Sequence, residues 1–213
     1  MPKHKVQKFT SVATVYFFAA IIFVTAVTHA ATISPMEMIK NVSEDVFRIL
    51  NTYPVSGPSE FLPKRREAIK AILDANFDSN EMAKLALGKY WKPLSDEQRQ
   101  EFSSLFYWRL YSFYILRIEL YSDQTIVYKN EKIAEEKASV LTRVSSKQYP
   151  EFDILYRLRN TGEGWKIYDV VIEGVSLIAN YRGQFNNFLS KKNSFEDLLA
   201  TLREKAPDNA DVK

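Results

Sequence analysis

The spacing of apolar residues changes twice along the chain, and these changes limit the folds that the sequence can form. Up to about residue 121, apolar side chains recur at helical spacing, which predicts amphipathic helices. From about 125 to 173 they alternate with polar residues, which predicts half-buried strands, and from about 176 the helical spacing returns. Helices, then consecutive strands, then helices indicate an α+β fold.

Four predicted helices precede the strands, and capping signals delimit them. Ser34-Pro35-Met36-Glu37 is a capping box with proline at the first helical position, and Ser95-Asp96-Glu97-Gln98 is a second capping box. Gly88 ends the third helix. The predicted helices cover about residues 35–52, 64–74, 78–88 and 96–121.

The fourth of these helices is apolar around most of its circumference. Between residues 105 and 121 only Arg109, Ser112, Arg117 and Glu119 are neither large and apolar nor aromatic. We expect such a helix to be buried on several sides. It is either the central helix of the core, or part of its surface faces something apolar that is not protein.

Four antiparallel strands are predicted from the alternating region. They cover about residues 125–128, 135–147, 152–159 and 165–173, with a hairpin loop at 160–164. Strict alternation in the last strand places Ile167, Asp169 and Val171 on one face, together with Trp165 and Glu173. The sheet is therefore expected to bend over a helical layer.

The first thirty residues have the pattern of a secretory signal peptide. Three lysines precede an apolar run, and small residues at Thr28 and Ala30 predict cleavage after Ala30. An uncleaved membrane anchor is the alternative, because the run from 9 to 27 is nearly long enough to span a bilayer. We predict one folded domain over 31–206 and a disordered tail at 207–213.

Cleavage of this segment would exclude several kinds of chemistry. It holds both histidines, His4 and His29, and the chain has no cysteine, so histidine or thiol catalysis and most zinc, copper and haem sites are not expected. Loss of its three lysines leaves 26 basic and 26 acidic residues, a balance that does not favour nucleic-acid binding. The remaining possibilities are acid–base catalysis by carboxylates or tyrosines, a metal site with oxygen ligands, or a protein without catalytic chemistry.

The segment after the last strand carries a weak catalytic signal. Gly174–Ile178 resembles the start of a nucleophile elbow, but Ile178 stands where the second glycine belongs, and no histidine is left to activate Ser176. Ser176 is instead expected to cap a helix that runs to about 190. A final helix, capped by Ser194, runs to about 205.

Three stretches of the chain resemble the MlaC family. They are Phe77–Trp91, the Ser-Asp-Glu-Gln-Arg-x-x-Phe opening of the aromatic helix, and GWKIYDVVIEGVSL at 164–177 with Asn180-Tyr181-Arg182 and Gln184-Phe185 after it. The resemblance extends over essentially the whole chain after residue 30. It implies a periplasmic phospholipid-binding protein of the toluene-tolerance, Ttg2 type, with a curved sheet against helices and no catalytic residue.

The resemblance also implies a ligand and partners. The protein would hold a phospholipid, as cargo and with no other cofactor, by its acyl chains in an apolar cavity. It would carry the lipid between an outer-membrane lipoprotein complex and an inner-membrane ABC transporter complex with its periplasmic substrate-handling subunit. Such transport would bear on outer-membrane lipid asymmetry.

On this hypothesis the cavity lies between the four-stranded sheet and the aromatic helix, and its lipid-binding wall consists of apolar residues from three segments. Core packing is the alternative role for each of them. The candidates are Phe106, Leu110, Phe113, Tyr114 and Tyr121 from the helix, Val140, Val144, Phe152, Ile154 and Tyr156 from the strands, and Ile167, Val175, Ile178, Tyr181 and Phe185 from the last motif. The arginines that could meet a head-group phosphate, or serve as solvated surface charge, are Arg143, Arg157, Arg159 and Arg182.

Three other functions stay open at this point. An isomerase-like enzyme could use Asp169 as general base in an apolar cavity, with Tyr156 or Tyr181 holding the oxyanion. An exported adapter could use a groove for a partner helix. A carrier could also take a hopanoid or another polycyclic lipid in place of a phospholipid.

Overall fold

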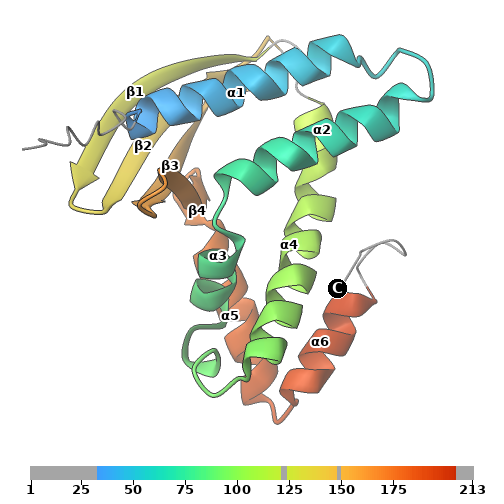
Figure 1. The fold of residues 1–213 in the computed structure, drawn as a ribbon, viewed down its shortest axis with the longest axis vertical. Coiled ribbons are helices and arrows are strands. Elements are labelled where there is room, and N and C mark those ends of the chain that lie inside the picture. The colour runs from blue at the N-terminus through green and yellow to red at the C-terminus, as the bar shows by residue number, and fades with distance from the viewer. Residues whose placement is uncertain (1–32, 121–123, 148–149, 205–213) are drawn as a thin grey trace, which may run out of the picture. The chain divides into compact units, whose positions relative to one another are not determined.

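The helices and strands follow the predicted order in the computed structural model, which describes residues 33–120, 124–147 and 150–204 (Figure 1). The predicted signal peptide, the tail at 207–213 and Tyr121 lie outside these ranges. None of the described helices combines the length and hydrophobicity needed to cross a bilayer. The helices are α1 (Pro35–Thr52), α2 (Phe61–Asn76), α3 (Ser79–Leu87), the 3₁₀ turn η1 (Gly88–Tyr90), α4 (Asp96–Glu119), α5 (Leu177–Ser190) and α6 (Phe195–Arg203).

The predicted starts of α1, α3, α4, α5 and α6 are confirmed by hydrogen bonds at their caps, whereas α2 begins at Phe61, before the predicted start at about residue 64, and has no side-chain cap. The Ser95 hydroxyl accepts a hydrogen bond from the Gln98 amide, and the Gln98 side chain accepts one from the Ser95 amide. Ser194 and Asp197 form the same reciprocal arrangement at α6. Ser176 caps α5 by accepting from the Ala179 amide, as expected of an N-cap and not of a nucleophile.

The strands form one antiparallel sheet in the order β1-β2-β3-β4-β5. It has five strands among the described residues, whereas the sequence predicted four. The strands are β1 (Thr125–Ala134), β2 (Lys137–Ser145), β3 (Phe152–Asn160), β4 (Trp165–Ile172) and β5 (Val175–Ser176). The extra strand arises because Glu173 and Gly174 both have positive φ, 49° and 79°. Two such residues reverse the chain tightly, so Val175 pairs with Ile172.

The strand β4 contains a bulge, so its side chains do not alternate between the two faces as the sequence predicted. Arg157 pairs with Asp169 but the next residue, Leu158, pairs with Ile167, so Tyr168 is an extra residue in the ladder. The bulge shifts the alternation by one position. Ile167, Val170 and Ile172 therefore share a face, which strict alternation did not predict.

The helix α1 covers part of the sheet. It packs against β1 and β2, and Met38 and Ile39 form a buried cluster with Ala138, Val140 and Leu158. The amide of Met36 donates to Oε1 of Glu131 at 2.7 Å, so β1 also satisfies the first turn of α1. This contact fixes where α1 begins on the sheet.

The other end of the molecule is a bundle of α3, α4, α5 and α6 (Figure 1). Its core is aromatic: Phe102 lies edge-to-face with Phe185 at 5.5 Å between ring centroids, and Phe106 lies edge-to-face with Tyr181 at 5.0 Å. Leu199 and Leu202 of α6 close the core. The first half of α4 is thereby enclosed by helices, while its second half extends toward the sheet.

Candidate functional site

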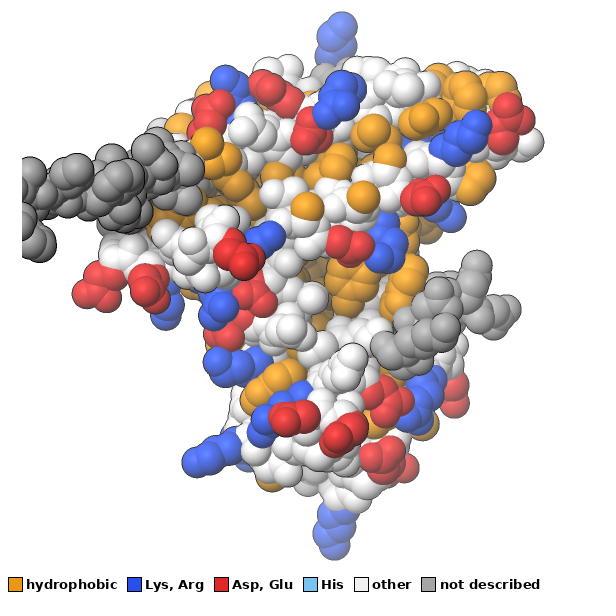
Figure 2. Space-filling view, viewed as in Figure 1, with side chains coloured by type: hydrophobic (Ala, Val, Ile, Leu, Met, Phe, Trp, Pro, Cys, Tyr) orange, Lys and Arg blue, Asp and Glu red, His pale blue; other side chains and the backbone are white. Residues whose placement is uncertain are grey.

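A pocket of about 640 Å³ lies between the sheet, α1 and the second half of α4, and it is partly open to solvent. The sheet contributes Val144, Ile154 and Val170, and α4 contributes Leu110 and Tyr114. In the space-filling view, hydrophobic side chains line a hollow below α2, between α3 and α4 (Figure 2). A volume of this size is typical of small-molecule sites.

Nine of the fifteen predicted wall residues line this pocket. They come from the helix and from three strands, so the structure brings together the segments that the sequence hypothesis combined. The nine are Phe106, Leu110, Phe113, Tyr114, Val144, Phe152, Ile154, Tyr156 and Ile167.

Three predicted residues of α5 lie elsewhere, in the aromatic core of the bundle. Ile178, Tyr181 and Phe185 are 2%, 8% and 5% exposed and do not line the pocket. The reason is the turn at Glu173 and Gly174, which directs α5 away from the pocket and toward α3. Their apolar stripe was predicted correctly, but it packs on helices.

Two further predicted residues do not line the pocket, and one lies outside the described residues. Val140 shares the pocket face of β2, but α1 covers it and it is fully buried. Val175 is 62% exposed because the tight turn places it on the short edge strand β5. Tyr121 lies outside the described ranges.

The wall that α1 provides was not predicted from the sequence. Ile39, Val42, Val46 and Phe47 all line the pocket, at the spacing of one helix face. That stripe was visible in the sequence as the mark of an amphipathic helix. Nothing in it indicated a ligand, because a core-facing stripe has the same spacing.

Three tyrosines of α4, Tyr107, Tyr111 and Tyr114, line the pocket without adding charge. Burial, followed by a hydrogen bond to Asp74, raises the pKa of Tyr107. Burial also raises the pKa values of Tyr111 and Tyr114. These phenols stay protonated at neutral pH, so they leave the lining polar in places but neutral.

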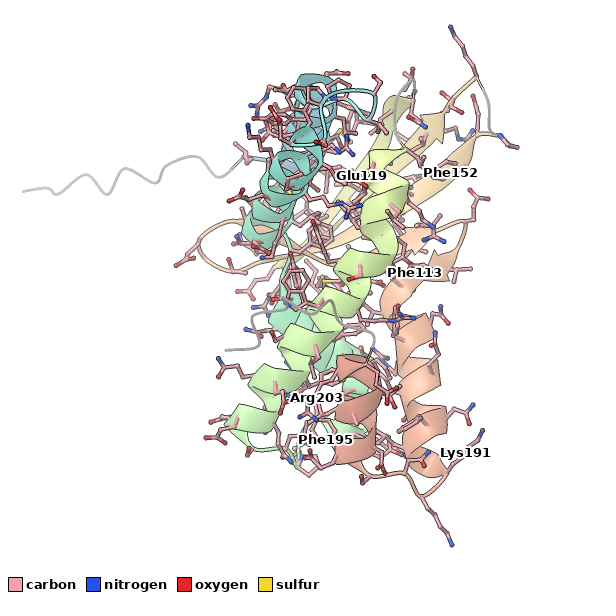
Figure 3. The ribbon with its side chains drawn as sticks, turned by 90° about the vertical axis from the view of Figure 1, so that its right-hand side faces the viewer. Phe113, Glu119, Phe152, Lys191, Phe195 and Arg203 are labelled. Atoms are coloured by element: carbon pink, nitrogen blue, oxygen red, sulfur yellow. The ribbon has the colours of Figure 1, made fainter. Side chains whose placement is uncertain are left out.

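A partly buried ionic clamp joins α2 to α4 beside the pocket, through Glu119, which is labelled near the end of α4 in Figure 3. The Glu119 carboxylate accepts from Nε of Arg66 at 2.9 Å and from Nε of Arg65 at 3.3 Å. Arg65 also donates to the carbonyl of Tyr53 at 2.8 Å. Burial alone would raise the pKa of Glu119, but Arg66 and then Arg65 hold it below its ordinary value.

The four arginines considered for a head-group phosphate or for surface charge do not line the pocket, and each has a protein partner. These partners agree with the alternative role of surface charge. Arg143 pairs with Asp153 (2.7 Å), Arg157 with Asp169 (2.9 Å) and Arg159 with Asp78 (2.7 Å), and Arg182 donates to the carbonyl of Leu85 (2.6 Å).

Asp169 is buried but does not line the pocket. Its carboxylate accepts from Arg157 at 2.9 Å, from the Ser176 hydroxyl at 2.7 Å and from the Ile178 amide at 3.1 Å. Because of the bulge it lies on the face of β4 opposite Ile167, with which strict alternation had placed it. A carboxylate held by three donors ties β3, β4 and α5 together, which is not the arrangement expected of a general base in the cavity.

Within the described ranges, no group of three or more carboxylate, imidazole or thiol side chains is arranged to hold a metal ion. Arg117 is the only charged residue among the described residues that line the pocket. The site can therefore enclose an apolar molecule and offers a cation at one place on its wall.

Comparison with known proteins gives consistent results. A family model described as MlaC protein matches residues 40–204. The toluene tolerance protein ttg2D of Pseudomonas putida is 26% identical over 159 residues, which are 74% of this chain and 72% of that protein. A solved structure of a phospholipid-binding protein from Ralstonia solanacearum, in complex with a phospholipid, has a TM-score of 0.73 at 24% identity, covering 81% of this chain and 97% of that one. This likeness confirms the α+β fold.

Proposed function

Because the chain belongs to the MlaC family, we propose that it is a carrier that binds a phospholipid by its acyl chains in the pocket between the sheet and α4. The observation that carries the proposal is the lining itself, in which Arg117 is the only charged residue among those described. The related solved protein, which shares this fold, holds a phospholipid.

The physical reason is the cost of exposing hydrocarbon to water. Each methylene that leaves water contributes about 0.8 kcal/mol, so a diacyl lipid outside a membrane needs an enclosed apolar surface. Apolar cavities take up apolar ligands in this way. Val144, Ile154 and Leu110 provide such a surface from the two opposite walls.

We also propose the setting in which this carrier works. The predicted signal peptide would export the chain to the periplasm, where lipid must cross an aqueous space. The partners would be an outer-membrane lipoprotein complex and an inner-membrane ABC transporter complex. The toluene tolerance protein of Pseudomonas putida is a relative of the same family, which supports a role at the cell envelope.

The direct test is extraction of the protein purified from a Gram-negative periplasm, followed by mass spectrometry of the bound lipid. We expect about one diacyl phospholipid per protein molecule. Extraction of a polycyclic lipid would favour the hopanoid alternative. Protein that carries no lipid and takes none up from vesicles would contradict the proposal.

A matched pair of variants on α4 locates the lipid. Leu110→Trp places an indole in the pocket, whereas Leu116→Trp places it at a position that is 56% exposed and does not line the pocket. We expect Leu110→Trp to lower the amount of bound lipid severalfold and Leu116→Trp to leave it unchanged. Equal lipid content in both variants would place the lipid elsewhere.

A further inference from the structure

Arg117 lies where the pocket meets solvent. Its side chain is exposed and also lines the pocket, and the same is true of Phe113, one turn earlier on α4, which is 42% exposed. Figure 3 shows Phe113 and Phe152, another lining residue, on the same side of α4. Phe113 and Arg117 therefore mark a part of the pocket rim.

The guanidinium group of Arg117 is held in a defined orientation at this rim. It lies over the Phe113 ring, 4.1 Å from the ring centroid, and Nη1 donates to the Phe113 carbonyl at 2.7 Å. A stacked guanidinium keeps its edge free for other acceptors. One of its five N–H donors is used, which leaves four for a ligand.

The charge of Arg117 is not balanced by a carboxylate within the described part of the chain. This distinguishes it from Arg143, Arg157 and Arg159, each of which pairs with an aspartate. A cation beside an apolar pocket favours a ligand that is apolar at one end and anionic at the other. A phospholipid has this character, because its phosphate is separated from the acyl chains only by the glycerol unit.

We propose that Arg117 binds the phosphate of the lipid head group at the mouth of the pocket. The proposal rests on the proposed carrier function and extends it from the acyl chains to the head group. The planar guanidinium can donate two parallel hydrogen bonds to phosphate oxygens, which a lysine cannot do. Arg117 would thus hold the lipid with its chains directed inward and favour phosphate-bearing lipids over neutral ones.

The test compares two ligands that differ in the phosphate. Delipidated protein is loaded from vesicles that contain equal amounts of phosphatidylglycerol and diacylglycerol with identical chains, and the ratio of the two bound lipids is measured. The proteins are wild type, Arg117→Gln, Arg117→Lys and the control Arg109→Gln, which removes a cation from α4 at a position that does not line the pocket. The ratio does not depend on small changes in stability, since both lipids are bound by the same folded protein.

We expect Arg117→Gln to lower the ratio of phosphatidylglycerol to diacylglycerol about threefold, the scale of an exposed charge interaction. Arg117→Lys should give an intermediate ratio, and Arg109→Gln the wild-type ratio. Raising the salt concentration should lower the wild-type ratio toward that of Arg117→Gln, because ions screen the contact.

Three results would overturn the proposal. A ratio that is the same in wild type and Arg117→Gln would exclude phosphate recognition by Arg117 while leaving the carrier function intact. Binding of inorganic phosphate alone that depends on Arg117, without any change in the lipid ratio, would assign the residue to a free anion. Failure of the wild-type protein to load either lipid would instead remove the carrier function itself, and this proposal with it.

Discussion

The two halves of α4 are made of the same kinds of side chain but end in different surroundings. In the first half, Phe102 and Leu105 are at most 1% exposed and lie in the core of the bundle, where Phe102 packs edge-to-face against Phe185 of α5. In the second half, Leu110 and Tyr114 face a pocket of about 640 Å³. Hydrophobicity alone therefore does not decide whether a helix forms core or cavity wall.

The surroundings differ because the partner elements differ. Helices α3, α5 and α6 enclose the first half of α4, and their side chains can interdigitate with its own. The second half faces an open sheet and α1 across the pocket, where the side chains from opposite walls do not meet. The bundle is held by aromatic packing, whereas the pocket region is also held by the ionic clamp at Glu119.

The largest difference between the regions should appear on truncation of one phenylalanine in each. Phe102→Ala leaves a cavity in a packed core and should lower the free energy of unfolding by about 4 kcal/mol. Phe152→Ala, at the half-buried start of β3, should lower the free energy of unfolding by only about 1 kcal/mol, because the Phe152 side chain already borders empty space. Denaturant unfolding of the delipidated proteins measures both, and equal losses would contradict the comparison.

Removal of the clamp should have the next largest effect. Glu119→Ala leaves Arg65, which is 4% exposed in its side chain, without its carboxylate, and should cost about 3 kcal/mol. Glu101→Ala is the control in the bundle, because its pair with Arg203 is partly exposed and should contribute less than about 1 kcal/mol. If the control lost as much as Glu119→Ala, the clamp would have no special role in the pocket region.

The smallest effect is the dependence of the clamp on pH. Because the folded protein holds the pKa of Glu119 below its ordinary value, the ionised carboxylate stabilises the fold above about pH 4.3 and this contribution is lost as the pH falls further. Glu119→Gln cannot ionise. We expect the difference in unfolding free energy between wild type and Glu119→Gln to be constant near neutral pH and to shrink below about pH 4.3.

The pH comparison has an internal control. The pKa values of Asp153 and Asp197 are also lowered, by the hydrogen bond from Arg143 and by the Ser194 amide respectively. These groups are present in both proteins, so their contributions cancel in the difference. A difference that stays constant down to pH 3 would show that Glu119 is not held ionised by the arginines.

Features that depend on neighbours in the chain were predicted well from the sequence. The caps at Ser95, Ser176 and Ser194 were correct because each hydrogen bond closes within three residues. The bulge at Tyr168 was missed, since it depends on how β4 pairs with β3. The same applies to β5, which forms only because Glu173 adopts a positive φ that the sequence does not signal.

The pocket lining was predicted only in part, because some of it follows from local sequence patterns and the rest from long-range packing. Val144, Ile154 and Phe152 were assigned to it because strand alternation identified their face. Tyr181 and Phe185 were also assigned to it but lie in the aromatic core of the bundle, because an apolar helix stripe does not show which element it packs against. Arg117 was passed over, since its place at the rim follows from the position of α4 relative to the sheet.

The sequence by itself determined the order of helices and strands, the helix caps and the lack of cysteine, because these follow from composition and from contacts over a few residues. Only the tertiary structure decided which apolar faces meet and which remain apart. That outcome depends on the register of β4 and the direction of α5, which are set by contacts between residues far apart in the chain. The pocket is the space that these long-range contacts leave unfilled.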